Sequence, residues 1–152
     1  MKNIAVLGIG NRLLMDDGIG VYIVEKLKEQ NICRSIRFIV GETDIDYCLD
    51  EINEAEFLII VDAAKLGNLP GDVTVVALDE VINTGNTGLS MHNLHLFDML
   101  VHTGKECKGL MIGIEPFEID YNWGLSTELN VKLPEILGTV RNIINSVVYL
   151  FM

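Results

Sequence analysis

Short, largely apolar runs recur along this chain, and segments with helical periodicity lie between them. The runs are residues 3–9, 36–40, 57–61, 73–78 and 109–114. Strands that are apolar throughout are typical of a sheet whose two faces are both covered. Parallel strands need crossover connections, and these are usually helices. The pattern therefore predicts an α/β fold with three layers: an open, mostly parallel five-stranded sheet with helices on both faces.

Helices are expected where apolar residues recur every three or four positions. They are predicted for residues 19–27, 47–53, 94–101 and 133–148. The N-cap of the second helix is expected at Asp44 or Asp46. Pro134 marks either a first turn or a kink in the last helix. Residues 79–90 contain Asn-Thr-Gly twice and are predicted to be a loop.

The length of 152 residues suits one domain spanning residues 1–152. The apolar runs fall well short of the ~20 residues that a membrane helix needs. The N-terminal stretch also lacks the length and cleavage site of a signal peptide. We therefore expect a cytoplasmic protein without a membrane partner, and a monomer.

The formal net charge of −11 argues against nucleic acid as a partner, since binding to phosphates depends on Lys and Arg. A basic partner, or one that presents a cation, fits this charge better. The three cysteines, Cys33, Cys48 and Cys107, are widely spaced and form no C-x-x-C motif. They are interpreted as reduced, structural thiols.

Polar residues follow three of the predicted strands, at the edge where binding sites form in such sheets. Asp16 and Asp17 come after the first strand, and Asp62 ends the third. His92 stands at the start of the helix after the fourth strand. Two carboxylates and an imidazole from three segments are suitable ligands for a hard or borderline divalent cation.

Each of these residues also has a structural alternative. Asp16 or Asp17 could cap the first helix, although one cap needs only one Asp. Asp62 could cap a loop, but an Asp that closes a buried apolar strand is more often functional. His92 could lie on a helix surface, and His95 is placed three positions later on the same helix face.

Two other functional classes share part of this pattern. A nucleotide-binding module would use the glycines of residues 8–13, but Leu13 replaces the third glycine and the acidic loop would repel a pyrophosphate. A phosphoacceptor receiver domain has an acidic pair directly at the end of its first strand and a Lys after its fifth. Here the pair is separated from Gly10 by a loop, and Glu115 precedes Pro116 after the fifth strand. A non-enzymatic receiver-like or nucleotide-binding module remains the alternative function.

Four motifs taken together resemble the maturation endopeptidases of NiFe hydrogenases. They are GIGNRLLMDDGIG at residues 8–20, IIVDAA at 59–64, SMHNL at 90–94 and GIEPFEIDYNWGLS at 113–126. They occur in the family's order with comparable spacing, and the match runs along nearly the whole chain. The first motif is the most specific, because its paired aspartates are foreign to a nucleotide-binding loop.

The resemblance implies a cytoplasmic, nickel-dependent endopeptidase that removes a C-terminal extension from the precursor of a hydrogenase large subunit. Nickel inserted into the precursor would serve as the recognition signal, so that the substrate supplies the metal and no nucleotide is needed. By motif, Asp17, Asp62 and His92 fall on the family's catalytic, metal-contacting positions. The first of these positions is Glu in some members and Asp in others, and Asp16 is left open as a second contributor.

One short segment departs from the family pattern. Members often carry Gly-Gly-Thr after the second strand, in a loop tied to the choice of substrate. Here the three residues are Gly41, Glu42 and Thr43, and they are predicted to form the substrate loop. Glu42 adds a charge and removes backbone freedom at this position, so which hydrogenase is served stays open.

Overall fold

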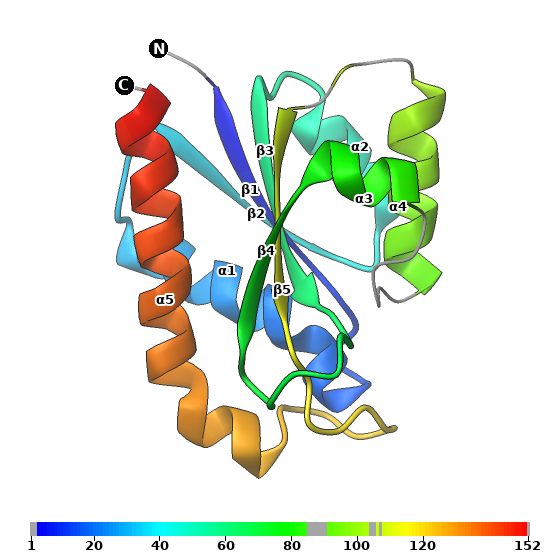
Figure 1. Ribbon diagram of the computed structural model, residues 1–152, viewed down its shortest axis with the longest axis vertical. Coiled ribbons are helices and arrows are strands. Elements are labelled where there is room, and N and C mark those ends of the chain that lie inside the picture. Colours follow the sequence, from blue (N-terminus) through cyan, green and yellow to red (C-terminus); the bar gives the residue numbers. More distant parts are fainter. Residues whose placement is uncertain (1–2, 85–90, 104–105, 107, 152) are drawn as a thin grey trace.

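The sheet of this protein has five strands in the order β2-β1-β3-β5-β4 (Figure 1). The computed structural model describes residues 3–84, 91–103, 106 and 108–151, except for the side chains of residues 84 and 91–94. The strands are β1 (Ile4–Ile9), β2 (Ile36–Glu42), β3 (Phe57–Ala63), β4 (Val73–Ala77) and β5 (Lys108–Ile114). All neighbours pair in parallel except β4, which lies antiparallel to β5 at the edge. The predicted mostly parallel sheet is confirmed.

Helices lie in the connections between these strands, except the one from β3 to β4, and another helix follows the last strand. They are the short 3-10 helix η1 (Met15–Gly18) and the α-helices α1 (Ile19–Gln30), α2 (Ile45–Ile52), α3 (Leu78–Thr84), α4 (Met91–His102) and α5 (Thr127–Phe151). In α2 the cap is Asp44, whose carboxylate accepts a hydrogen bond from the Tyr47 N–H at 3.0 Å. The choice between Asp44 and Asp46 is thereby decided.

Two helix boundaries differ from the sequence prediction. The loop prediction for residues 79–90 is wrong for residues 79–84, which belong to α3, because Leu78 and Val81 are three positions apart and both are buried against the sheet. Residues 85–90 lie outside the described residues. Helix α5 begins at Thr127 rather than near residue 133. Ser126 caps it, since its Oγ accepts the Leu129 N–H at 3.2 Å. Pro134 therefore lies in the helix interior and not in its first turn.

Two hydrophobic cores cover the two faces of the sheet. Alternate residues of β1 enter different cores, with Ile4 and Val6 in one and Ala5 and Leu7 in the other. The first core is closed by α1 and α5, and the second by α2, α3 and α4. Figure 1 shows these helices on opposite sides of the sheet, which gives the three layers predicted from the sequence.

The direction in which strands are added to the sheet reverses between β1 and β3. From β1 the chain moves outward to β2, and it then returns to β3 on the other side of β1. The chain leaves β1 toward one edge of the sheet and leaves β3 toward the other, and the carboxyl ends at such a switch point are where binding sites form in α/β sheets. Polar residues that follow β1 and β3 are therefore brought to one place.

Within the described part of the chain, no helix has the length and apolar character needed to cross a membrane.

Candidate active site

Asp62 is a completely buried carboxylate near the end of β3. Among the described residues, neither of its oxygens has a hydrogen-bond partner. Burial raises the pKa of Asp62 well above its ordinary value, the nearby charge of Asp17 raises it further, and the backbone N–H of Ala63 acts in the opposite direction. A buried carboxylate without a partner destabilises the fold, so its presence points to a functional role.

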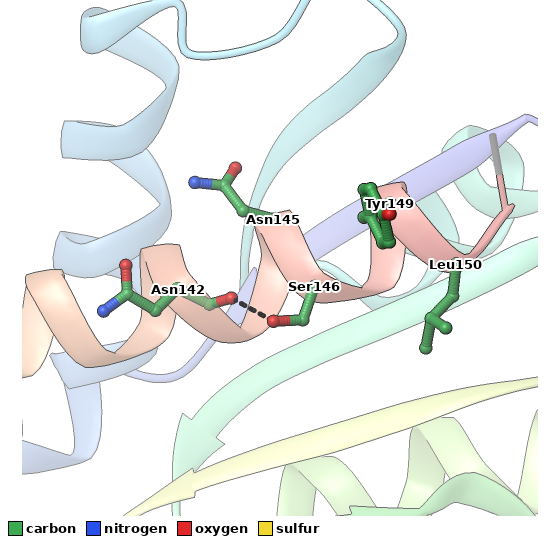
Figure 2. Close-up of a pocket in the computed structure, with 5 residues that line it drawn as sticks. All are labelled: Asn142, Asn145, Ser146, Tyr149 and Leu150. Atoms are coloured by element: carbon green, nitrogen blue, oxygen red, sulfur yellow. Dashed lines mark hydrogen bonds between the residues drawn. The ribbon is translucent and has the colours of Figure 1, made fainter.

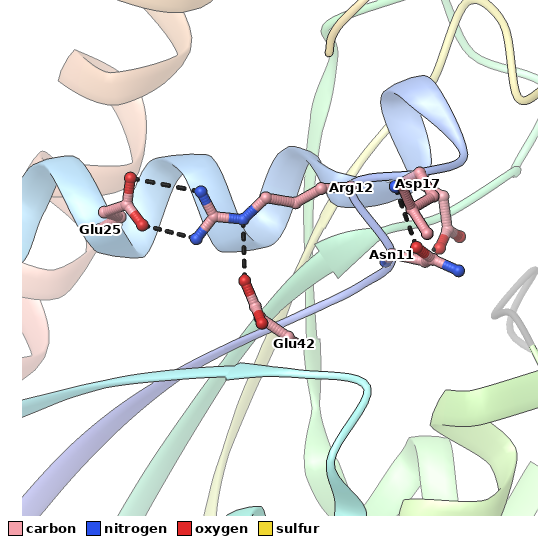
Figure 3. Close-up of polar contacts among 6 residues, drawn as sticks. Asn11, Arg12, Asp17, Glu25 and Glu42 are labelled. Atoms are coloured by element: carbon pink, nitrogen blue, oxygen red, sulfur yellow. Dashed lines mark hydrogen bonds and ion pairs between the residues drawn. The ribbon is translucent and has the colours of Figure 1, made fainter. Parts of the chain in front are cut away.

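Asp17 is the second carboxylate of the site and lies in η1, directly after the loop that leaves β1. It is 3% exposed, and its Oδ2 accepts the Asn11 N–H at 2.9 Å (Figure 3). The Asn11 side chain in turn accepts the Leu13 N–H at 2.9 Å, which shapes the loop. Because the charge of Asp17 acts on Asp62, the two carboxylates share one electrostatic environment.

Two glycines allow η1 and α1 to approach the strand ends this closely. A Cβ on Gly10 would lie 2.1 Å from the carbonyl oxygen of Asp17, and the φ of Gly10 is 141°. A Cβ on Gly20 would lie 2.1 Å from the carbonyl oxygen of Val61, the residue before Asp62. Side chains at these positions would push η1 and α1 away from β3. The glycines of the first motif thus bring Asp17 and Asp62 together.

Asp16 is buried like its neighbour but has a different set of contacts. Its Oδ2 accepts hydrogen bonds from the Phe117 N–H at 3.0 Å, the Glu118 N–H at 2.9 Å and the Ser126 hydroxyl at 2.8 Å. Its Oδ1 accepts the Ser126 N–H at 2.7 Å. Asp16 therefore binds the loop between β5 and α5. The capping alternative is wrong for both aspartates, because the N-cap of α1 is Gly18, with no side-chain cap hydrogen bond.

His92 is the second residue of α4, and its side chain lies outside the described part of the structure. Asp62 shares its strand face with Leu58 and Ile60, which belong to the core closed by α4. His95 is exposed, so it does not face the carboxylates. Among the side chains that are described, no three His, Cys, Asp or Glu form a metal-binding group. The role of His92 stays a prediction.

Comparison with known proteins decides the family. The model of the hydrogenase maturation protease family matches residues 21–143. The hydrogenase expression/formation protein HupM of Azotobacter chroococcum is 34% identical over 143 residues, which are 90% of this chain and 68% of that protein. This chain belongs to the hydrogenase maturation protease family. Its resemblance to that family, seen in four sequence motifs, is confirmed.

Other members support the same assignment in sequence and fold. The hydrogenase 2 maturation protease of Escherichia coli is 32% identical over 143 residues, covering 90% of this chain and 87% of that protein. The solved structure of the hydrogenase maturating endopeptidase HybD from E. coli superposes with a TM-score of 0.80 at 31% identity, covering 96% of this chain and 93% of that one. The chain is accordingly a hydrolase of the endopeptidase type, and not a receiver or nucleotide-binding module.

The segment predicted to be the substrate loop, Gly41 to Thr43, begins within β2 rather than after it, and it is tied to the loop that carries Asn11. Glu42 ends β2 with a φ of 53°, a left-handed conformation that favours glycine. Its carboxylate forms an ion pair with the Arg12 Nε at 3.0 Å, and Arg12 also pairs with Glu25 at 2.5 Å (Figure 3). Thr43 is exposed beside it. Sequence reasoning missed Arg12, because nothing in its neighbourhood indicates a partner 30 residues away in the chain.

Glu115 is another buried carboxylate that the sequence did not single out. Its two oxygens accept the Leu66 N–H at 2.9 Å and the Gly67 N–H at 3.2 Å. It thereby holds the loop that follows β3. A receiver domain would have a Lys after its fifth strand. Here Glu115 stands at that place and holds the loop after β3 instead.

Cys48 is unsuited to nucleophilic catalysis. Cys33 and Cys48 are both free, and Cys107 lies outside the described residues. Burial raises the pKa of Cys48 to about 11, with a smaller contribution from Asp44. A thiol with so high a pKa is almost never ionised at neutral pH.

A surface hollow on α5 lies away from the carboxylates (Figure 2). It is lined by Asn142, Asn145, Ser146, Tyr149 and Leu150. The last turns of α5 reach the end of the molecule that holds both termini, whereas the site is at the carboxyl ends of the strands (Figure 1). None of the predicted site residues lines this hollow.

Proposed function

We propose that this protease removes the C-terminal extension of a NiFe hydrogenase large-subunit precursor after nickel has been inserted, acting in the cytoplasm without a nucleotide. Asp17, Asp62 and His92 contact the nickel ion that the precursor carries. The family assignment supports the reaction class. The observation that carries the proposal is the completely buried carboxylate of Asp62, which has no hydrogen-bond partner among the side chains and main-chain groups that the structure describes.

The donor set suits a cation that arrives with the substrate. Asp62 offers two oxygens that have no partner in the described part of the chain, and Asp17 lies near enough for its charge to act on them. Carboxylate and imidazole ligands are compatible with nickel and with other borderline divalent ions. A cation beside Asp62 would favour its ionised form and relieve the repulsion between the carboxylates. The unfavourable burial of the two carboxylates in the free protein thus favours binding of a substrate that carries a metal ion.

The two carboxylates also supply groups for peptide hydrolysis. When bound, the substrate's nickel can polarise the scissile carbonyl or a water molecule, in addition to fixing the position of the peptide. One carboxylate of the pair takes a proton from the attacking water, whose oxygen bonds to the carbonyl carbon. The C–N bond then breaks and the departing amine receives a proton. The raised pKa of Asp62 favours this residue as the proton carrier.

The test uses nickel-loaded precursor and follows processing as a mobility shift on a gel. We expect Asp17→Asn, Asp62→Asn and His92→Ala to stay folded by circular dichroism and to leave the precursor uncleaved. His95→Ala is the matched control, because His95 is an exposed histidine one turn further along α4. It should process at the wild-type rate.

Two results would contradict the proposal at different points. Normal processing by His92→Ala would show that His92 is not part of the site. Equal processing of nickel-free and nickel-loaded precursor would show that nickel is not the recognition signal. The endopeptidase activity itself would not be contradicted.

A further inference from the structure

Large apolar side chains are exposed on the loop between β5 and α5 and on the loop after β1. Their exposed fractions range from 38% to 90%, and the residues are Leu13, Phe117, Ile119, Tyr121 and Trp123. The two loops lie side by side, since Leu14 and Asn122 form a parallel β-bridge. Exposed apolar residues that gather in this way are typical of surfaces that bind other proteins. We call this set the aromatic platform.

The aromatic platform is held in a fixed shape by hydrogen bonds between the two loops. Four of them join main-chain groups: Gly124 N–H to Arg12 C=O at 3.4 Å, Asn122 N–H to Leu13 C=O at 3.0 Å, Met15 N–H to Asn122 C=O at 3.0 Å and Asp16 N–H to Glu118 C=O at 3.2 Å. The carboxylate of Asp16 accepts four more from the same loop. A surface ordered before binding loses little conformational entropy on binding, which favours affinity.

The platform is continuous with the proposed active site. Asp16 anchors the platform, and the next residue, Asp17, faces Asp62. A protein whose nickel reaches these carboxylates therefore comes within contact distance of the platform. Because the proposed substrate is a protein subunit rather than a short peptide, surface beyond the cleaved segment is available to dock there.

The charge around the platform selects the chemistry of the partner. Glu118, Asp120 and Glu128 are exposed, and no Lys or Arg occurs between residues 109 and 131. An apolar segment flanked by Lys or Arg is complementary to this surface. An acidic or strongly anionic partner would be repelled.

We propose that the aromatic platform docks an apolar, Lys- or Arg-flanked surface of the hydrogenase large-subunit precursor, and that Asp16 fixes this platform relative to the active site. The inference rests on the proposed function for the identity of the partner. It assigns the two adjacent aspartates to different tasks, with Asp17 on the metal and Asp16 as a positioning residue for docking.

The first test compares two double variants in processing of nickel-loaded precursor. Tyr121→Ser with Trp123→Ser removes the most exposed aromatic side chains of the platform, and both residues have little contact with the fold. Tyr149→Ser with Leu150→Ser is the matched control, since these residues are equally exposed on the distant end of α5. We expect the KM of the platform variant to rise at least tenfold with kcat within twofold of wild type, and the control to keep both constants. An unchanged KM, or an equal rise in the control, overturns the proposal.

The second test observes docking without catalysis. Trp123 is the single tryptophan of the chain, so incorporation of 5-fluorotryptophan gives one ¹⁹F resonance on the platform. We expect this resonance of the Asp62→Asn protein to shift and saturate when unlabelled, nickel-loaded precursor is added. An unmoved resonance overturns the docking surface even if the wild type processes the precursor. A shifted resonance with a wild type that fails to process supports docking and refutes the proposed function instead.

Two further arms of the same experiment address other occupants. A shift on concentrating the protein alone would assign the platform to self-association. A shift on adding phosphatidylcholine vesicles would assign it to a lipid surface. Either result overturns the proposal, which requires that the precursor alone move the resonance.

Discussion

Asp62→Asn is expected to stabilise the metal-free protease at neutral pH, although it abolishes processing. Asp62 is completely buried and its oxygens have no partner among the described residues. The amide has nearly the same shape, but it carries no charge and is not repelled by Asp17. Stabilisation by removal of an active-site group is expected where function, and not folding, requires that group.

The magnitude follows from the free energy of burying a polar group without a hydrogen bond. That penalty is about 1–3 kcal/mol for a neutral group and larger for a charged one. In Asp62→Asn the side chain is still a buried polar group. Only the additional penalty of burying a charge is therefore removed. We expect a gain in the free energy of unfolding of about 1–3 kcal/mol at pH 7.

The pH dependence has a definite sign. The pKa of Asp62 is raised in the folded state, whereas an unfolded aspartate titrates near ~3.9. Between these two pKa values the folded protein binds more protons than the unfolded chain, so raising the pH lowers stability. The penalty of Asp62 is absent below about pH 4 and grows as the pH rises toward the folded pKa. The advantage of Asp62→Asn should therefore shrink on acidification from pH 7 to pH 4.5.

Asp16→Asn is the matched control, because Asp16 is an equally buried carboxylate in the same region. Its two oxygens accept four hydrogen bonds, and an Asn would present an NH₂ group to at least one of those donors. Loss of that bond and of the charge on the others should destabilise the protein by about 3 kcal/mol.

The assay is urea unfolding followed by circular dichroism with EDTA present, for wild type and both variants at pH 7 and pH 4.5. Opposite shifts in the free energy of unfolding at pH 7 are expected for the two variants. The reasoning is refuted if Asp62→Asn is less stable than wild type at pH 7, or if both variants shift in the same direction.

The remaining predictions concern backbone positions near the site. Gly20→Ala should destabilise the protein by about 1–3 kcal/mol and reduce processing, because its Cβ would lie 2.1 Å from the Val61 carbonyl oxygen. Gly138→Ala, with no atom within 4 Å of its Cβ, should instead stabilise α5 by about 0.5–1 kcal/mol in the same thermal or urea unfolding. Glu42→Gly should be more stable than Glu42→Ala by about 1 kcal/mol, since both lose the ion pair with Arg12 but only Gly adopts a φ of 53° without strain. Equal stability of the two Glu42 variants would show that this residue is not strained.

The site could be predicted in part because its residues follow strands that are easy to recognise. Asp62 closes a fully apolar strand, and Asp17 follows the first strand in a glycine-rich loop. In a parallel sheet both positions belong to one edge, so their convergence needs only the strand assignments. His92 remains a prediction, since α4 brings its backbone to the core face that Asp62 shares while its side chain is not described.

Sequence alone determined the fold class, the family and the edge of the sheet where Asp17 and Asp62 lie close together. These follow from local patterns: apolar runs, helical spacing and short motifs, each contained in a few neighbouring residues. The sequence also predicted a loop where α3 forms, because the Asn-Thr-Gly repeats are typical of loops. The helix depends on the burial of Leu78 and Val81, which only packing on the sheet reveals.

Only the tertiary structure showed which contacts each of the two adjacent aspartates makes. The family motif places Asp17 on the metal-contacting position, but no local pattern indicates the partners of Asp16. The contacts of Asp16 cross about 100 residues of chain, as with the Phe117 N–H, whereas the charge of Asp17 acts on Asp62 near the end of the neighbouring strand β3. Such contacts arise from the strand order and the course of the loops, which no local pattern encodes. Folding gives Asp16 four hydrogen bonds, whereas Asp62 has no partner among the described groups.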